Sequence, residues 1–107
     1  MITINCKIND EECKMKVNGH AGYNPGNDIV CAGVSAIVTM LAGYLINRLD
    51  RTQLVKMELD NGNADIQVTG DAVEIFEMAT IGLMQIEKAY PKNVKVILEN
   101  AEASTNR

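Results

Sequence analysis

The sequence predicts an α+β domain in which two helices pack on one mostly antiparallel, five-stranded sheet. Five short segments are rich in apolar side chains, and in the first two these alternate with polar ones, as in strands that bury one face. Two longer segments are apolar at helical spacing, and turn residues separate the segments in the order ββαββαβ. The 107 residues suit one domain, so we assign residues 1–107 to a single unit.

The first two strands are predicted to form a hairpin. Apolar side chains fall at every second position in residues 2–8, and the alternation resumes in residues 13–17 after a polar turn at residues 9–12. Cys6 and Cys13 share the parity of the apolar positions. We therefore expect both thiols in the core, where a free thiol behaves as a small hydrophobic group.

Residues 19–30 form a predicted loop that is rich in glycine and asparagine. Helical spacing of apolar residues starts at Ile29 and continues to Leu49, and Asp28 stands where an N-cap is expected. The uncharged run Ile29–Asn47 contains several Gly, Ala and Ser residues. We therefore interpret it as a buried helix and not as a membrane span.

A second hairpin is predicted around Asn61-Gly62, a pair typical of tight turns between strands. Its strands occupy residues 53–59 and 64–68. A last short strand is predicted over residues 94–98.

Asp71 is expected to cap a second helix over residues 72–90, which Pro91 ends. Both predicted helices are apolar on more than one stripe, whereas a surface helix on a small sheet needs one. We therefore expect a homodimer, with twofold symmetry, that covers the outer helix faces. The small, polar residues 101–107 are expected to fray.

Composition excludes several classes of partner. Ten Lys and Arg against fourteen Asp and Glu give a net charge of -4 and a pI near 4.9. Without a basic run, direct binding of nucleic acid or of an anionic membrane is not expected. Three cysteines, an odd number, without an export signal predict free thiols in the cytoplasm. No cofactor is expected.

Cys31 differs from the other two cysteines because it falls in the first turn of the predicted helix. Unpaired backbone N–H groups and the positive end of the helix dipole favour a thiolate there. His20, the one histidine, lies at the end of the second strand, and the loop could bring it back to Cys31. A thiol and an imidazole within reach form a minimal nucleophile and base pair. Unrelated positions for the two residues are the alternative, and two ligands are too few for a structural zinc.

Four further positions have two interpretations each. Asp28 could orient the imidazole or serve only as the N-cap, and Ser35 could touch the thiol or substrate or allow a close helix contact. Gly22 and Gly26 could let the loop open and close or simply form turns.

The two segments around His20 and Cys31 resemble the ribosomal-processing cysteine protease family, called Prp. They read Gly-His-Ala-Gly-Tyr at residues 19–23 and Asp-Ile-Val-Cys-Ala-Gly-Val-Ser-Ala at residues 28–36. The similarity extends over nearly the whole chain. It implies a small cytoplasmic homodimer that removes an N-terminal extension from the precursor of a large-subunit ribosomal protein.

The resemblance also implies roles for individual residues. It makes His20 the general base and Cys31 the nucleophile, with Asp28 and Ser35 close to them and a loop that moves when substrate binds. In a mechanism with these roles, backbone N–H groups of Cys31 and Ala32 at the helix start would stabilise the oxyanion. Two other classes stay open: a non-catalytic dimeric adaptor that binds a ribosomal protein, and a thiol redox sensor.

Overall fold

A computed structural model of the chain describes residues 1–99 and confirms the predicted order of elements. The strands are β1 (Ile2–Ile8), β2 (Glu12–Asn18), β3 (Thr52–Asp60), β4 (Asn63–Gly70) and β5 (Val94–Leu98), and the helices are α1 (Ile29–Asn47) and α2 (Val73–Ala89). The fraying expected for residues 101–107 lies outside the described residues.

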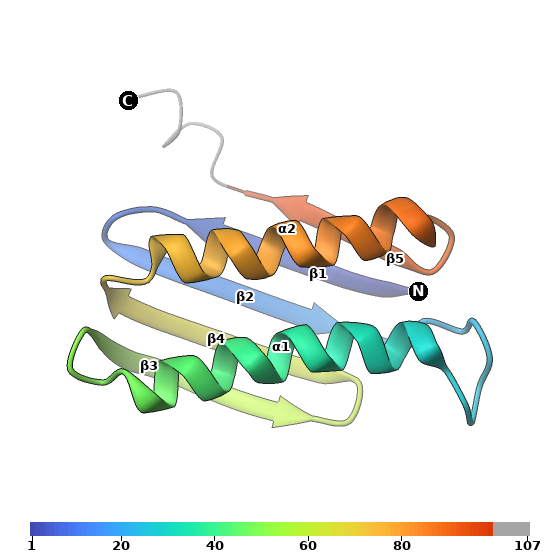
Figure 1. Cartoon of the computed structure of the whole chain (residues 1–107), viewed down its shortest axis with the longest axis horizontal. Helices are drawn as coiled ribbons and strands as arrows, with labels where there is room; N and C mark the ends of the chain where they lie inside the picture. The colour runs from blue at the N-terminus through green and yellow to red at the C-terminus, as the bar shows by residue number, and fades with distance from the viewer. Residues whose placement is uncertain (100–107) are drawn as a thin grey trace.

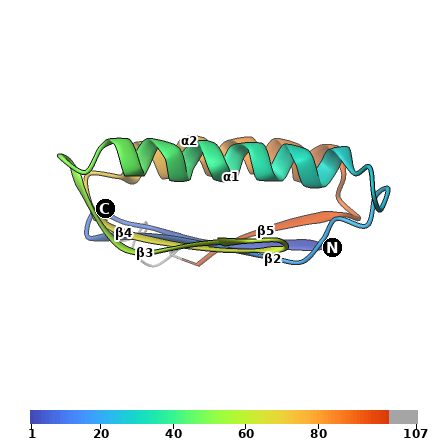
Figure 2. The ribbon, with the colours of Figure 1, turned by 90° about the horizontal axis from the view of Figure 1, so that it is seen from below.

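The five strands form one sheet in the order β3-β4-β2-β1-β5. The neighbours β1–β2, β2–β4 and β3–β4 are antiparallel, and β5 pairs with β1 in parallel. Both helices cover the same face of this sheet, so the molecule has two layers (Figures 1 and 2). The predicted mostly antiparallel sheet under two helices is thus confirmed.

The core lies between the two layers. In the three central strands β1, β2 and β4, nearly all the alternate positions that face the helices are buried, and α1 and α2 meet them with Leu41, Leu45, Phe76 and Leu83. Cys6 and Cys13 are both buried, as predicted. Burial raises the pKa of each of these two thiols, so they stay protonated and unreactive at neutral pH.

The two predicted helix caps have different outcomes. Asp28 is the N-cap of α1, as predicted. Asp71 does not cap α2, because the N-cap position falls on Ala72, which makes no side-chain cap bond. The Asp71 carboxylate instead pairs with the guanidinium of Arg51, and its N–H donates to the Arg51 carbonyl at 3.1 Å. The prediction was wrong because a partner twenty positions earlier in the chain competes for the carboxylate.

Helix α1 is long and apolar enough to cross a membrane by length and composition alone, with a mean hydropathy of 2.2. In the structure it lies along the sheet, and its buried side chains contribute to the core: Val30, Val34, Val38, Leu41, Ala42 and Leu45. This arrangement supports the interpretation of α1 as a core helix.

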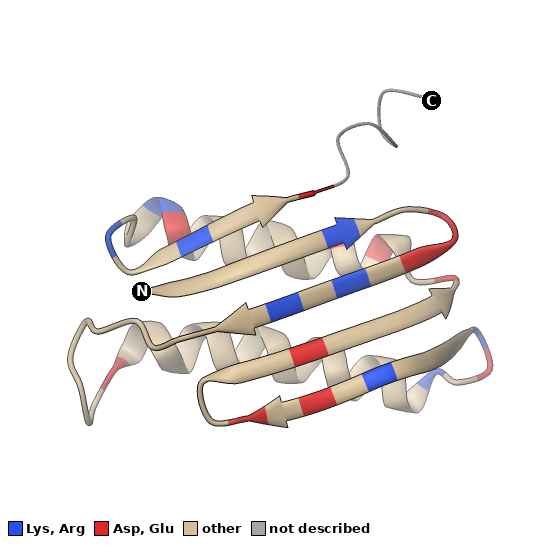
Figure 3. Ribbon diagram, turned by 180° about the vertical axis from the view of Figure 1, so that it is seen from behind, with Lys and Arg blue, Asp and Glu red and all other residues tan. Residues whose placement is uncertain are grey.

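The sheet face away from the helices is polar and divided by charge (Figure 3). Lysines lie on β1, β2 and β5, whereas β3 and β4 carry most of the acidic side chains. Lys56 joins the acidic side at 3.1 Å from Asp65. This charged face is typical of a solvated surface, so the candidate site has to be sought on the helix side and at the strand ends.

Candidate active site

Cys31 lies in the first turn of α1, at the end of the loop that follows β2. Its side chain is half-buried, which leaves the sulfur accessible. The positive end of the α1 dipole acts on this position and favours a negatively charged sulfur. The sequence prediction of a cysteine at a helix start is confirmed.

The carboxylate of Asp28 holds this helix start in place. Its Oδ1 accepts N–H bonds from Val30 and Cys31 at 2.9 and 3.0 Å, and its Oδ2 accepts them from Tyr23 and Asn24 at 2.9 and 3.1 Å. Desolvation alone would raise the pKa of Asp28, but the four N–H donors outweigh it and lower that pKa. Asp28 therefore caps the helix and holds the loop closed. Its carboxylate accepts bonds from backbone N–H groups and not from the imidazole.

His20 follows the end of β2 by two residues and packs on the hairpin between β3 and β4. Gly19 N–H donates to the Gly62 carbonyl at 2.8 Å, which ties the end of β2 to this hairpin. A Cβ atom at Gly62 would lie 2.7 Å from Nε2 of His20, so the imidazole rests directly on the bare Gly62 backbone. Gly62 also has a φ of +82°, so the position favours glycine for two reasons.

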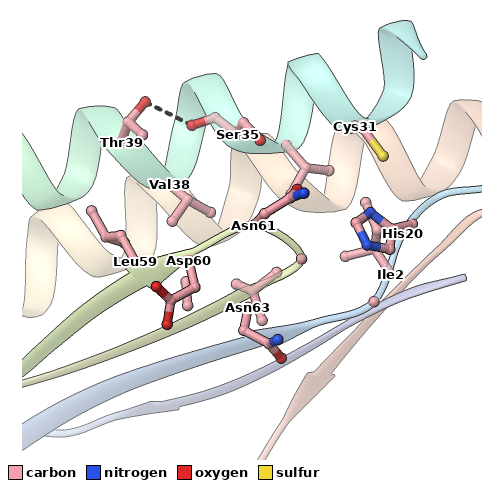
Figure 4. A pocket seen from close by; sticks show the side chains of 15 residues that line it. Ile2, His20, Cys31, Ser35, Val38, Thr39, Leu59, Asp60, Asn61 and Asn63 are labelled. Atoms are coloured by element: carbon pink, nitrogen blue, oxygen red, sulfur yellow. Dashed lines mark hydrogen bonds between the residues drawn. The ribbon is translucent and has the colours of Figure 1, made fainter. Parts of the chain in front are cut away.

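His20 and Cys31 line one cavity of about 140 Å³ between α1, the end of β2 and the β3–β4 hairpin. Figure 4 shows the Cys31 sulfur directed from α1 toward the segment that carries His20. Polar groups also come from Ser35, Thr39, Asp60, Asn61 and Asn63. Its remaining side-chain lining is largely apolar and includes Ile2, Val17, Val34, Val38, Leu59 and Ala64.

The hydrogen bond that reaches the Cys31 sulfur comes from the backbone. Ala21 N–H donates to Sγ at 3.2 Å, and within residues 1–99 the imidazole of His20 makes no hydrogen bond to the thiol. The two side chains therefore line one cavity without a hydrogen bond between them. Hydrogen bonds between catalytic groups often tighten only when substrate binds.

The other predicted site residues occupy three kinds of position. Ser35 is exposed on α1 and lines the cavity one turn after Cys31. Gly22 and Gly26 lie in the loop with φ of +69° and +90°, and neither lines the cavity. Their positive φ values fit the turn interpretation, while a role in loop opening stays a prediction.

The N–H groups predicted to stabilise an oxyanion are not free in this structure. Cys31 N–H donates to Oδ1 of Asp28, and Ala32 N–H donates to the Asp28 carbonyl, both at 3.0 Å. Sequence reasoning treated them as orphan donors because it could not see how tightly Asp28 caps the helix. The N–H that does face the reacting sulfur, that of Ala21, was missed.

The β3–β4 hairpin was also missed as a part of the site. Asn61 and Gly62 were predicted correctly as a turn, but their place beside His20 depends on the pairing of β4 with β2. No local sequence pattern predicts that β4 pairs with β2. Within the described residues, no group of three or more His, Cys, Asp or Glu side chains is placed to hold a metal ion.

A thiol at a helix N-terminus and an imidazole on the same open cavity are the minimal equipment of a cysteine peptidase. A family model described as "Cysteine protease Prp" matches residues 1–95, and the chain belongs to this family of cysteine proteases. The chain is 28% identical over 103 residues to a Staphylococcus aureus protein named "Ribosomal processing cysteine protease Prp", which covers 90% of this chain and 97% of that protein.

Solved structures share the fold. A structure of S. aureus Prp with a covalently linked product peptide has a TM-score of 0.75, at 24% identity over 92% of this chain and 100% of that chain. A second S. aureus Prp structure, with a substrate peptide, has a TM-score of 0.70 at the same identity and coverage. At this level of identity the structures support the architecture of the chain.

The two oxygens of Asp28 can be separated by the substitution Asp28→Asn. An asparagine keeps one oxygen for the helix start, but its NH2 group cannot accept the N–H bonds of Tyr23 and Asn24. We expect the amides of Tyr23 and Asn24 to lose hydrogen-exchange protection while the amides of α1 keep theirs. Equal loss along α1 would contradict the division of roles.

Acid should reproduce this loop release in the unsubstituted chain. Because the folded pKa of Asp28 is lowered, its contribution to loop order is complete above the ordinary carboxyl pKa and is lost as pH falls through the lowered one. Amide NMR signals of Tyr23 and Asn24, followed from neutral to acidic pH, should move in the unsubstituted chain and stay flat in Asp28→Asn.

Gly62→Ala should displace the imidazole of His20, because the new Cβ would lie 2.7 Å from Nε2. Gly70→Ala is the matched control, since Gly70 also has a positive φ and a Cβ there would meet the Arg51 carbonyl oxygen at 2.7 Å, at the far end of β4. Each change should cost about 1–3 kcal/mol of stability from backbone strain. Only Gly62→Ala should lower kcat in a peptide-cleavage assay; equal activity in both variants would contradict the packing role.

Proposed function

We propose that this chain removes the N-terminal extension from the precursor of a large-subunit ribosomal protein. The observation that carries the proposal is the shared cavity of Cys31 and His20 at the start of α1. The name of the Staphylococcus aureus relative and the resemblance of residues 19–23 and 28–36 to the Prp family support this substrate class.

The proposed reaction has two halves. His20 takes the proton of the Cys31 thiol, and the thiolate attacks the carbonyl carbon of the scissile bond. His20 then gives the proton to the leaving amine, which leaves a thioester on Cys31. Water, deprotonated by His20, hydrolyses the thioester and restores the thiol. The helix dipole of α1 favours the negative charge in both steps.

The cavity indicates what kind of side chain lies beside the scissile bond. Six aliphatic side chains contribute to its walls, and its volume of about 140 Å³ has room for one apolar side chain. Burying such a side chain contributes about 1.5–3 kcal/mol to peptide binding. Ser35 and Asn61 lie in the lining, where they can meet the peptide backbone.

The adaptor and redox-sensor alternatives have less support. Redox-sensor cysteines often lie next to a resolving thiol, but Cys6 and Cys13 are buried with raised pKa values. An adaptor does not need a thiol and an imidazole on one cavity. Free thiols fit a reducing compartment, which supports a cytoplasmic location as part of the proposal.

Cleavage of the extended ribosomal-protein precursor tests this function directly. The unsubstituted chain should give a single cut near the precursor's N-terminus, read by mass spectrometry. Cys31→Ala should abolish it, and His20→Gln should slow it by about 10²–10⁴-fold, the usual contribution of general base catalysis. Cys13→Ala, which removes a buried thiol away from the cavity, should leave the cut in place. Binding without a cut would favour the adaptor.

A homodimer through the helix layer is part of the proposal. Met78 and Ile81 of α2 are 56% and 57% exposed, and Met40 and Ile46 of α1 are exposed as well. Apolar side chains gathered on the helices are expected to be covered, and a second copy provides a matching surface.

Ile81→Lys should therefore convert the dimer into a monomer, because a lysine would be desolvated in an apolar interface. Val55→Lys is the matched control, since Val55 has the same exposure of 57% but lies on β3. Sedimentation should give the mass of one chain for Ile81→Lys and of two chains for Val55→Lys. One chain for the unsubstituted protein would end the dimer proposal.

A further inference from the structure

Ala21 links the proposed base to the proposed nucleophile. It follows His20 directly in the chain, and its N–H donates to Sγ of Cys31 at 3.2 Å. Its methyl group is buried, with 2% of the residue exposed. Any movement of Ala21 therefore changes both the backbone position of His20 and the polar environment of the sulfur.

The carbonyl of Ala21 accepts a hydrogen bond from a residue 72 positions later in the chain. Asn93, in the turn between α2 and β5, donates from Nδ2 to the Ala21 oxygen at 2.9 Å. Only the nitrogen of an amide side chain can donate to a carbonyl, so this contact fixes which way the Asn93 amide points. Both polar groups of Ala21 are thus engaged, one by Asn93 and one by Cys31.

Asn93 is itself a fixed point. Its backbone N–H donates to the Tyr90 carbonyl at 2.9 Å, and its carbonyl accepts from the N–H of Ile2 at 2.8 Å. The second bond joins the turn to the start of β1, the strand that pairs with both β2 and β5. The side-chain amide of Asn93 therefore projects from a part of the fold that the sheet holds rigid.

A second contact ties the loop to the same turn. The ring of Tyr23 meets the ring of Tyr90 edge to face, with centroids 5.2 Å apart and planes at 75°. Such aromatic pairs add about 0.5–1.5 kcal/mol beyond their buried area. The turn between α2 and β5 thus holds the first residues of the loop by two independent contacts.

We propose that Asn93 is a positioning residue for the Cys31 thiol: by holding the Ala21 carbonyl, it keeps the Ala21 N–H directed at the sulfur. An N–H donated to sulfur stabilises the thiolate more than the thiol, because the donor bond to a charged acceptor is the stronger one. Asn93 therefore favours ionisation of Cys31 without touching substrate. The inference rests on the proposed function only in taking Cys31 as the nucleophile.

The test measures the pH dependence of Cys31 alkylation by iodoacetamide, read by peptide mass spectrometry. Cys6 and Cys13 are buried, so Cys31 is the accessible thiol. In Asn93→Ala we expect the midpoint of alkylation to move to higher pH by up to about one unit, the size of one hydrogen bond. Below the midpoint this is a loss of up to about tenfold in alkylation rate.

Two variants control for other causes. Asn47→Ala removes the same kind of contact, an amide that donates to the Gly43 carbonyl at 2.8 Å near the end of α1, and should not move the midpoint. Asn93→Asp keeps the side-chain shape without the donor and should move it at least as far as Asn93→Ala. Thermal unfolding of every variant shows whether the chain is folded during alkylation.

The outcomes divide cleanly. A shifted midpoint in both Asn93 variants, with none in Asn47→Ala, supports the positioning role. An unchanged midpoint in folded Asn93→Ala overturns it, and so does a shift seen in Asn93→Asp alone, which would reflect only the added charge. Alkylation needs no peptide, so a chain that shows the shift but cuts no precursor would refute the proposed substrate and keep the role of Asn93.

Discussion

The site depends on one carboxylate that receives four backbone N–H groups. Oδ1 of Asp28 caps the start of α1, and Oδ2 holds the loop closed. Asp28 lies three positions before Cys31, so both sets of bonds are anchored next to the thiol. The helix start sets the direction of the dipole at the sulfur, and the loop closure sets where the chain between His20 and Cys31 can run. A side chain with a single acceptor oxygen could perform only one of these tasks.

The position of His20, the proposed base, depends on the sheet as well as on the loop. His20 leaves β2 where β2 pairs with β4, so the β3–β4 hairpin lies beneath the imidazole. At the opposite side, β5 pairs with β1 and brings Asn93 to Ala21. Because β1 and β2 pair with β5 and β4, three distant parts of the sequence come together at the site.

Local patterns predicted the helices and strands but not the contacts between them. The period-two alternation of residues 2–8 and the helical spacing after Asp28 reflect burial of one face, which each segment carries in its own composition. Asp28 and Asp71 both precede helical segments, yet only Asp28 caps, because Arg51 competes for Asp71 through a contact between separate elements. The sequence identified His20 and Cys31 as candidates. It could not place Gly62 or Asn93 beside them, because those contacts also join separate elements.

The closed loop also bears on how a substrate is selected. Opening of the loop, which the family resemblance implies, breaks the bonds of Tyr23 and Asn24 to Oδ2 of Asp28 and leaves the two at the helix start intact. Two such bonds to a charged acceptor are worth about 3–6 kcal/mol together. An apolar side chain that enters the cavity contributes about 1.5–3 kcal/mol, which offsets about half of that cost. Under the proposed function, a peptide without such a side chain would lack this contribution and would open the loop less readily.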